Sequence, residues 1–183
     1  MTRSVLVRAP HLFLGLSLLA GALLPATSFA AIFVEIPEVG ACGTATVTGF
    51  ENDIEATGVT KDVERAVDAR TGLPGPGTKL FRTLTVIKHP NNCTPLLFLA
   101  GVAGQVLTLR ISFVPSGSTQ ASVELLATQV AITKSHLSEA ADIQEAIDFG
   151  IGGTLTITQR STTSTGEPTT VTKCWDFAHA RAC

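Results

Sequence analysis

The 183-residue chain lacks the short motifs that mark common catalytic and nucleotide-binding sites. It contains no Gly-x-Ser-x-Gly or Ser-x-x-Lys nucleophile motif, no His-Glu-x-x-His metal motif and no glycine-rich loop ending in Gly-Lys-Ser/Thr. Beyond residue 30 the histidines are His89, His136 and His179, which are far apart in the sequence at the ends of expected strands. That spacing is typical of surface histidines rather than of a catalytic group. We therefore expect no enzymatic activity and no cofactor.

The chain also lacks an excess of basic residues, which nucleic-acid-binding proteins need. It has 13 lysines and arginines against 15 aspartates and glutamates. Two of the basic residues and none of the acidic ones lie in the first 30 residues, so the remainder carries a net charge of −4. This mild acidity argues against nucleic acid as a partner.

The N-terminal segment has the layout of a secretory signal peptide. Arg3 and Arg8 precede an apolar stretch, Leu12–Leu24, and small residues end at Ala30. The apolar stretch is too short to span a bilayer comfortably, which disfavours the alternative of an uncleaved anchor. We expect residues 1–30 to be a cleaved signal peptide and residues 31–183 to form one domain. The protein would then be periplasmic or extracellular, with no stable membrane insertion after cleavage.

All the cysteines lie after the leader: Cys42, Cys93, Cys174 and Cys183. An even number of cysteines in an exported chain indicates two disulfides. Three pairings are possible; the sequence favours Cys174–Cys183 as a local link and Cys42–Cys93 as the long-range one.

Two groups of side chains have the chemistry of metal ligands. Cys174, His179 and Cys183, with Asp176 nearby, are an alternative to a disulfide, but they lack the CxxC pairing of zinc sites. The acidic alternation Glu51, Asp53, Glu55 offers oxygen ligands for calcium, but it has no known calcium-loop spacing. We expect neither group to bind a metal, and the acidic residues to form a solvated loop.

Most of the chain after residue 30 has the alternating, β-branched pattern of strands. The segment 59–70 fits either a helix or a polar strand, and we favour the strand or an extended arm ending in a loop at 71–77. The glycines at 150, 152 and 153 are expected at bulges or close backbone approaches. The expected strands are 32–36, 44–50, 81–89, 106–114, 121–126, 130–136, 147–158 and 170–177. Many short strands indicate a β-barrel or sandwich.

One segment has the pattern of a helix with no polar face. Thr94 suits the N-cap, Pro95 the first helical position, and Gly104 the end of an apolar run from Leu96 to Ala103. Such a helix should be hidden, either plugging a barrel end or lying against a partner. We expect packing or assembly roles for Pro95, Leu96, Leu97, Phe98, Leu99 and, on the last strand, Trp175.

The order of these elements resembles the Hcp (hemolysin-coregulated protein) family, the tube-forming proteins of type VI secretion. Three features carry the resemblance: the strand–bend–proline–helix block at 82–104, the acidic entry to a long strand at 145–158, and Trp175-Asp176 near the end. It spans roughly residues 32–180. The resemblance implies an all-β dominated barrel flanked by one α-helix. It also implies hexameric rings with a wide central hole that stack into tubes. The leader and the four cysteines distinguish this chain from family members built in the cytoplasm.

Two functions follow as hypotheses. The first is an exported, non-enzymatic structural protein that assembles with itself into rings or tubes, with a link to type VI secretion and to its secretion or effector proteins. The second is a monomeric exported β-barrel that binds a protein or a small ligand through loops 51–80 and 159–170.

Overall fold

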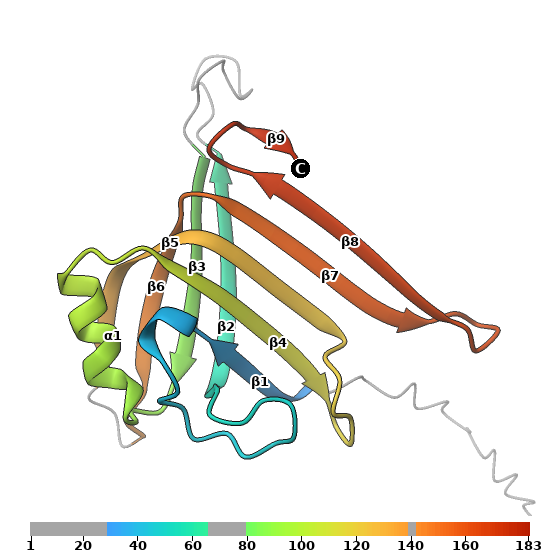
Figure 1. Ribbon diagram of the computed structural model, residues 1–183, viewed down its shortest axis with the longest axis horizontal. Coiled ribbons are helices and arrows are strands. Elements are labelled where there is room, and N and C mark those ends of the chain that lie inside the picture. Colours follow the sequence, from blue (N-terminus) through green and yellow to red (C-terminus); the bar gives the residue numbers. More distant parts are fainter. Residues whose placement is uncertain (1–28, 66–79, 139–141) are drawn as a thin grey trace, which may run out of the picture.

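The computed structural model describes residues 29–65, 80–138 and 142–183 (Figure 1). The predicted leader, apart from its last two residues, and the predicted loop at 71–77 lie outside these ranges. In chain order the described elements are β1 (Phe29–Glu35), the 3-10 helix η1 (Pro37–Val39), β2 (Ile54–Arg65), β3 (Leu80–Lys88), α1 (Cys93–Val102), β4 (Leu107–Pro115), β5 (Val123–Leu137), β6 (Glu145–Ile151), β7 (Thr154–Thr162), β8 (Pro168–Asp176) and β9 (Arg181–Ala182).

Six of the strands close into a barrel. The neighbours run β4-β1-β2-β3-β6-β5, and β5 pairs with β4 to complete the circle; every pairing is antiparallel. The core is formed by alternate residues of these strands, including Val34, Leu84, Ile111 and Phe149. The predicted β-barrel with one flanking helix is confirmed. β3 lies between β2 and β6, as its two apolar faces indicated.

The strand predicted at 147–158 is interrupted but remains one ladder against β5. β6 and β7 both pair with the same edge of β5, through Ile151 opposite Val130 and Leu155 opposite Ala127. Between them, a Cβ on Gly152 would lie 2.9 Å from the carbonyl oxygen of Gln129, which is closer than real Cβ contacts. The prediction of close backbone approach is therefore correct. The break lets the chain leave the barrel: the second edge of β6 pairs with the barrel strand β3, whereas the second edge of β7 pairs with β8, outside the barrel.

We call β7, β8 and the turn between them the arm. It extends away from the barrel on the side opposite α1 (Figure 1). Most residues of β8 are exposed, including Val171 and Trp175. β9 pairs only with Trp175 and Asp176, so over the rest of β8 the outer edge has no strand of the described chain beside it.

Other strand predictions differ from the structure at 44–50 and at 121–136, whereas the strand favoured at 59–70 is confirmed as far as it is described. Residues 44–50 form an irregular loop rather than a strand, because their hydrogen bonds are local turns and because Phe50 turns inward to stack on Phe33 with ring centroids 4.6 Å apart. The strands predicted at 121–126 and 130–136 are one strand, β5, which passes through Gln129 at a φ of 51°. The segment 59–70 is a strand as far as Arg65, and the remainder lies outside the described residues.

Candidate assembly surface

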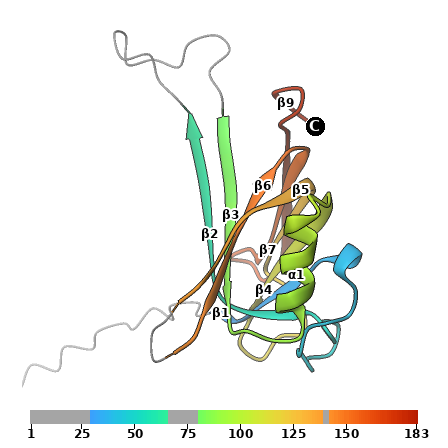
Figure 2. The ribbon, with the colours of Figure 1, turned by 90° about the vertical axis from the view of Figure 1, so that its left-hand side faces the viewer.

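The helix α1 lies beside the barrel with only one side covered (Figure 2). Its buried residues are Cys93, Leu97 and Ala100. Cys93 and Leu97 join the main core, and α1 contacts β5 and η1. Of the two expected positions for α1, plugging a barrel end is not seen, because Phe98 is 61% exposed and Val102 is 73% exposed. An all-apolar helix can bury only one side against a barrel, so its opposite side reaches solvent unless a partner covers it.

We call the exposed side of α1 the helix face. It consists of Leu96, Phe98, Leu99 and Val102. Pro95 is also exposed, at the third position of the helix rather than the first. Of the predicted packing residues, therefore, Leu97 packs in the core while its neighbours on α1 do not. Contiguous exposed apolar side chains of this size mark interaction sites in soluble proteins.

A groove of about 420 Å³ borders the helix face. Its apolar walls come from α1, through Phe98 and Val102, and from β5, through Ile132 and Leu137. The two walls approach closely at Gly101, where a Cβ would lie 3.2 Å from a methyl carbon of Ile132. The groove enlarges the apolar surface that a partner could cover.

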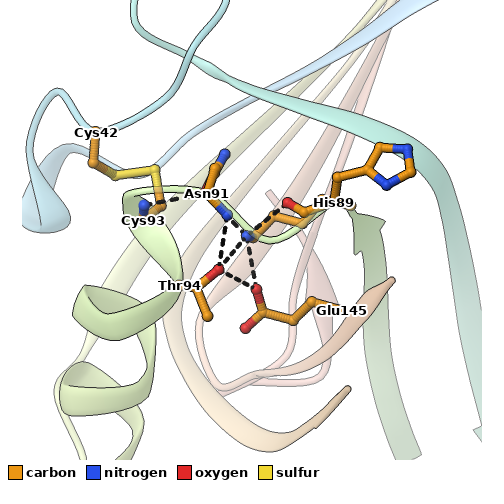
Figure 3. The surroundings of a disulfide bond; sticks show 7 residues. Cys42, His89, Asn91, Cys93, Thr94 and Glu145 are labelled. Atoms are coloured by element: carbon orange, nitrogen blue, oxygen red, sulfur yellow. Dashed lines mark hydrogen bonds and ion pairs between the residues drawn. A yellow bond between two sulfur atoms is a disulfide. The ribbon is translucent and has the colours of Figure 1, made fainter. Parts of the chain in front are cut away.

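A buried ion pair fixes the start of α1 from the barrel side (Figure 3). Lys88 at the end of β3 is 0% exposed and Glu145 at the start of β6 is 2% exposed; Nζ lies 2.7 Å from Oε2. The Thr94 hydroxyl joins both charges, because it donates to Glu145 Oε2 at 2.7 Å and accepts from Lys88 Nζ at 2.9 Å. Lys88 also donates to Asn91 Oδ1 at 3.1 Å and to the carbonyl of His89 at 3.3 Å. The ion pair therefore holds the residue that follows Cys93.

Asn91 orders the first turn in the way expected of Thr94. The helix begins at Cys93, two residues earlier than the predicted cap allows, and the Asn92 side chain makes no capping bond. Instead, Asn91 Oδ1 accepts the N–H of Cys93 at 3.0 Å, and the N–H of Asn91 donates to Thr94 Oγ1 at 3.1 Å. Gly104 ends the helix with a φ of 63°, as predicted.

A disulfide fixes the start of α1 from the other side. Cys93 is joined to Cys42, which lies in the loop between η1 and β2 (Figure 3). The second disulfide joins Cys174 on β8 to the C-terminal Cys183. These are the pairings that the sequence favoured. The alternative metal site at the C-terminus is absent from the structure, because both of its cysteines are bonded and the Asp176 carboxylate contacts His179 Nδ1 at 2.7 Å.

The ion pair Lys88–Glu145 was not predicted from the sequence, although a signal was present. Lys88 follows Leu84 and Val86 on the buried face of β3, and Glu145 precedes Ile147 on the buried face of β6. Each charge therefore stands at the end of an alternating apolar row. Opposite charges in that position on two strands indicate a buried pair, but strand order is needed to bring them together.

The predicted acidic loop lies at the opposite end of β1 from the leader. Asp53 lines a cavity of about 200 Å³ together with Glu35 and Glu51. The pKa of Asp53 is raised to about 6, chiefly by burial and next by the Glu35 carboxylate; Arg110 lowers it, and Glu51 raises it by a smaller amount. Arg110 pairs with Glu35 at 2.7 Å. Among the residues that the structure describes, no group of three or more side chains is arranged to hold a metal ion.

The remaining predicted features are on the surface or inside strands. His89 and His179 are exposed, as is His136. The predicted loop 51–80 is largely strand β2 where it is described, and 159–170 comprises the ends of β7 and β8 with a short turn. No helix within 29–65, 80–138 or 142–183 is long and apolar enough to cross a bilayer.

The family model described as "Type VI secretion system effector, Hcp" matches residues 33–159, more than two thirds of the chain. The chain belongs to the Hcp family. As a member of that family it is a structural protein of type VI secretion, and the family is one of tube proteins rather than enzymes. No curated protein matches the chain.

Solved Hcp structures share the fold of this Hcp protein at low sequence identity. A type six secretion system protein has a TM-score of 0.70 at 20% identity, over 85% of this chain and 100% of its own. Hcp1 from Salmonella typhimurium has a TM-score of 0.65 at 17% identity, over 84% of this chain and 98% of its own. Hcp2 from the same organism has a TM-score of 0.58 at 16% identity, over 82% and 98%. The barrel and its arm are thus shared, while most side chains differ.

Proposed function

We propose that this Hcp protein is exported through its N-terminal leader and assembles with itself into rings, hexameric by family resemblance, that can stack into tubes. Residues 1–30 act as a cleaved signal peptide, and residues 31–183 act as the ring subunit outside the cytoplasm. The observation that carries the proposal is the helix face, which the subunit leaves open although it is apolar throughout.

The positions of the open surfaces favour a head-to-tail contact. The helix face and the arm lie on opposite sides of the barrel (Figure 1). When two different surfaces on opposite sides of one subunit contact each other between neighbouring copies, the interface is heterologous. Such an interface gives a closed ring when the rotations between successive subunits add up to a full turn. The uncovered edge of β8 adds backbone groups that another subunit can pair with.

The helix face alone is too small for a stable interface. A ten-residue helix is about 15 Å long, whereas stable interfaces bury about 800 Å² on each partner. The groove beside α1 and the arm therefore have to contribute to the contact. Val171 and Trp175 are the apolar residues that the arm presents, and we assign them to this contact.

The test is the mass of the mature, disulfide-intact protein in solution. We expect native mass spectrometry and sedimentation velocity to show a ring that dissociates on dilution. Phe98→Asp should prevent assembly without unfolding, because the side chain is exposed in the subunit but desolvated in the contact. Thr119→Asp, on the exposed turn between β4 and β5, adds the same charge elsewhere and serves as the matched control. A wild type that stays monomeric at high micromolar concentration contradicts the proposal.

A second candidate is a monomeric binding module, which one cavity favours. The cavity measures about 370 Å³ and lies between the β4–β5 turn and the arm, within the predicted contact segment 159–170. Arg160 and several hydroxyl groups line it, and Arg160 Nη1 donates to the carbonyl of Ala121 at 3.3 Å. A recurrent partner pulled down by the wild type but not by Arg160→Ala, together with a monomeric mass, would favour this candidate over the ring.

A further inference from the structure

The attachment of α1 to the barrel rests on few buried side chains, one of which belongs to a disulfide. Only three of its ten residues are buried, and one of these three is Cys93, the disulfide cysteine. The other two, Leu97 and Ala100, lie one and two turns further along. Apolar burial, which normally holds a helix on a domain, is therefore small for a helix of this composition.

The same bond holds the loop that covers the start of α1. Cys42 lies 51 residues before Cys93, in the irregular segment between η1 and β2. This segment has no pairing with a barrel strand between Gly40 and Asp53; its backbone bonds are local, such as Gly43 N–H to the carbonyl of Asn52. Breaking the disulfide therefore unlinks the loop from the helix: the loop keeps its Phe50–Phe33 stack, the helix start keeps the Thr94 contacts, and the two can move relative to each other.

A loosened helix affects assembly more than it affects the barrel. The six strands keep their hydrogen bonds and most of their core without Cys93. The helix face, in contrast, has to be held in one place for a partner to fit it. A mobile surface must be ordered when the partner binds, and the conformational entropy lost in ordering it lowers the affinity. The disulfide pre-organises the surface to which we assign self-assembly.

We propose that formation of the Cys42–Cys93 disulfide switches this Hcp protein from an assembly-incompetent to an assembly-competent state after export, an inference that rests on the proposed self-assembly. In the reducing cytoplasm both cysteines are thiols and the precursor stays unassembled. Outside it, the two thiols lose two protons and two electrons to a disulfide-bearing oxidoreductase or oxidised glutathione. The new S–S bond forms as the disulfide of that oxidant is reduced to two thiols.

The second disulfide does not have this role. Cys174–Cys183 closes a loop of nine residues around the C-terminus, where β9 and the residues beside it are exposed. Neither cysteine contacts α1 or belongs to the core. Because Cys174 lies on the arm beside Trp175, its removal can disturb the proposed contact, so the control is instead Thr44→Ala, an exposed position in the loop that carries Cys42.

The experiment compares three oxidised proteins: wild type, Cys42→Ala and Thr44→Ala, which keeps both disulfides. Cys42→Ala breaks the helix disulfide but leaves the Cys93 side chain in the core, so no cavity is made there. Sedimentation velocity over a concentration series measures assembly, and far-UV circular dichroism measures the fold. We expect Cys42→Ala to keep the strand spectrum and to need at least about tenfold more protein for half-assembly, a loss of roughly 1.4 kcal/mol. The control should assemble like the wild type.

The outcomes separate this inference from the proposed function. A wild type that never assembles contradicts the proposed function itself. A wild type that assembles, with Cys42→Ala assembling equally well, overturns only the redox inference. Loss of the fold in Cys42→Ala also overturns it, because the bond is then a folding requirement. Equal loss of assembly in the control assigns the effect to any change in the loop and overturns the role of Cys42–Cys93. Hydrogen exchange supports the inference if faster exchange in Cys42→Ala is confined to residues 93–103 and the loop at 40–53.

Discussion

Removal of one member of the buried ion pair Lys88–Glu145 is expected to cost more stability than removal of an exposed charge. In Lys88→Met the ammonium is replaced by an apolar group of similar length, while Glu145 stays 2% exposed with no cation near it. Breaking a buried pair in this way typically costs about 3–5 kcal/mol, close to the whole stability of a marginal domain. We expect urea unfolding of Lys88→Met to show a loss of about 4 kcal/mol.

The double variant tests the reasoning behind that number. Lys88→Met/Glu145→Leu removes both charges, so no ion is left buried without a partner. Its cost should be far smaller, about 0–2 kcal/mol, because the variant loses hydrogen bonds to Thr94, Asn91, Ser135 and the His89 carbonyl but leaves no unpaired ion buried. The coupling energy in the double-mutant cycle should then be at least about 2 kcal/mol in favour of the pair, and larger by whatever Glu145→Leu costs alone. Additive losses in the two single variants would refute the idea that an unpaired charge causes the damage.

Further substitutions test the helix, the acidic cavity and the disulfides. Leu97→Asp should unfold the domain because it buries an ion, whereas Phe98→Asp should leave its melting temperature within a few degrees; equal melting curves would contradict the assigned orientation of α1. Asp53 binds a proton in the folded state up to about pH 6 but in the unfolded state only below about pH 4, so stability should fall as the pH rises between these values. Asp53→Asn should flatten this pH dependence and stabilise the protein at pH 7 by about 1 kcal/mol, a value reduced because the carboxyl group is partly exposed. If the variant unfolds with the same pH profile as the wild type, Asp53 is not the cause of the pH dependence. Reductant should lower the melting temperature, since each disulfide contributes about 2–4 kcal/mol, and an unaltered calorimetric trace would argue against both bonds.

The sequence predicted the elements whose pattern is local. Alternation identified β3 and β4, and the run of apolar residues ended by Gly104 identified α1. The glycines at 152 and 153 were correctly expected at a close approach, because a bare backbone in a strand usually has another backbone beside it.

What the sequence could not predict depends on residues far apart in the chain. The loop at 44–50 alternates like a strand, but stacking of Phe50 on Phe33 overrides that local preference. The exposure of Phe98 follows from the position of β5 against one side of α1, and a uniformly apolar helix gives no indication of which side that is. Lys88 and Glu145 meet only because β3 and β6 are neighbours, which is a property of strand order.

The continuity of β6 and β7 along β5 has a mechanical consequence. A neighbouring molecule that pulls on the arm loads β7, and β7 shares with β6 one uninterrupted partner strand, which is itself bonded to β4 on its far edge. A force along the strands then loads the backbone hydrogen bonds between β7 and β5 in shear, so that they share the force and do not break one at a time. The arm is thus anchored to the closed barrel, so a load that a neighbouring subunit of the proposed ring applies to the arm would be transmitted to the barrel strands.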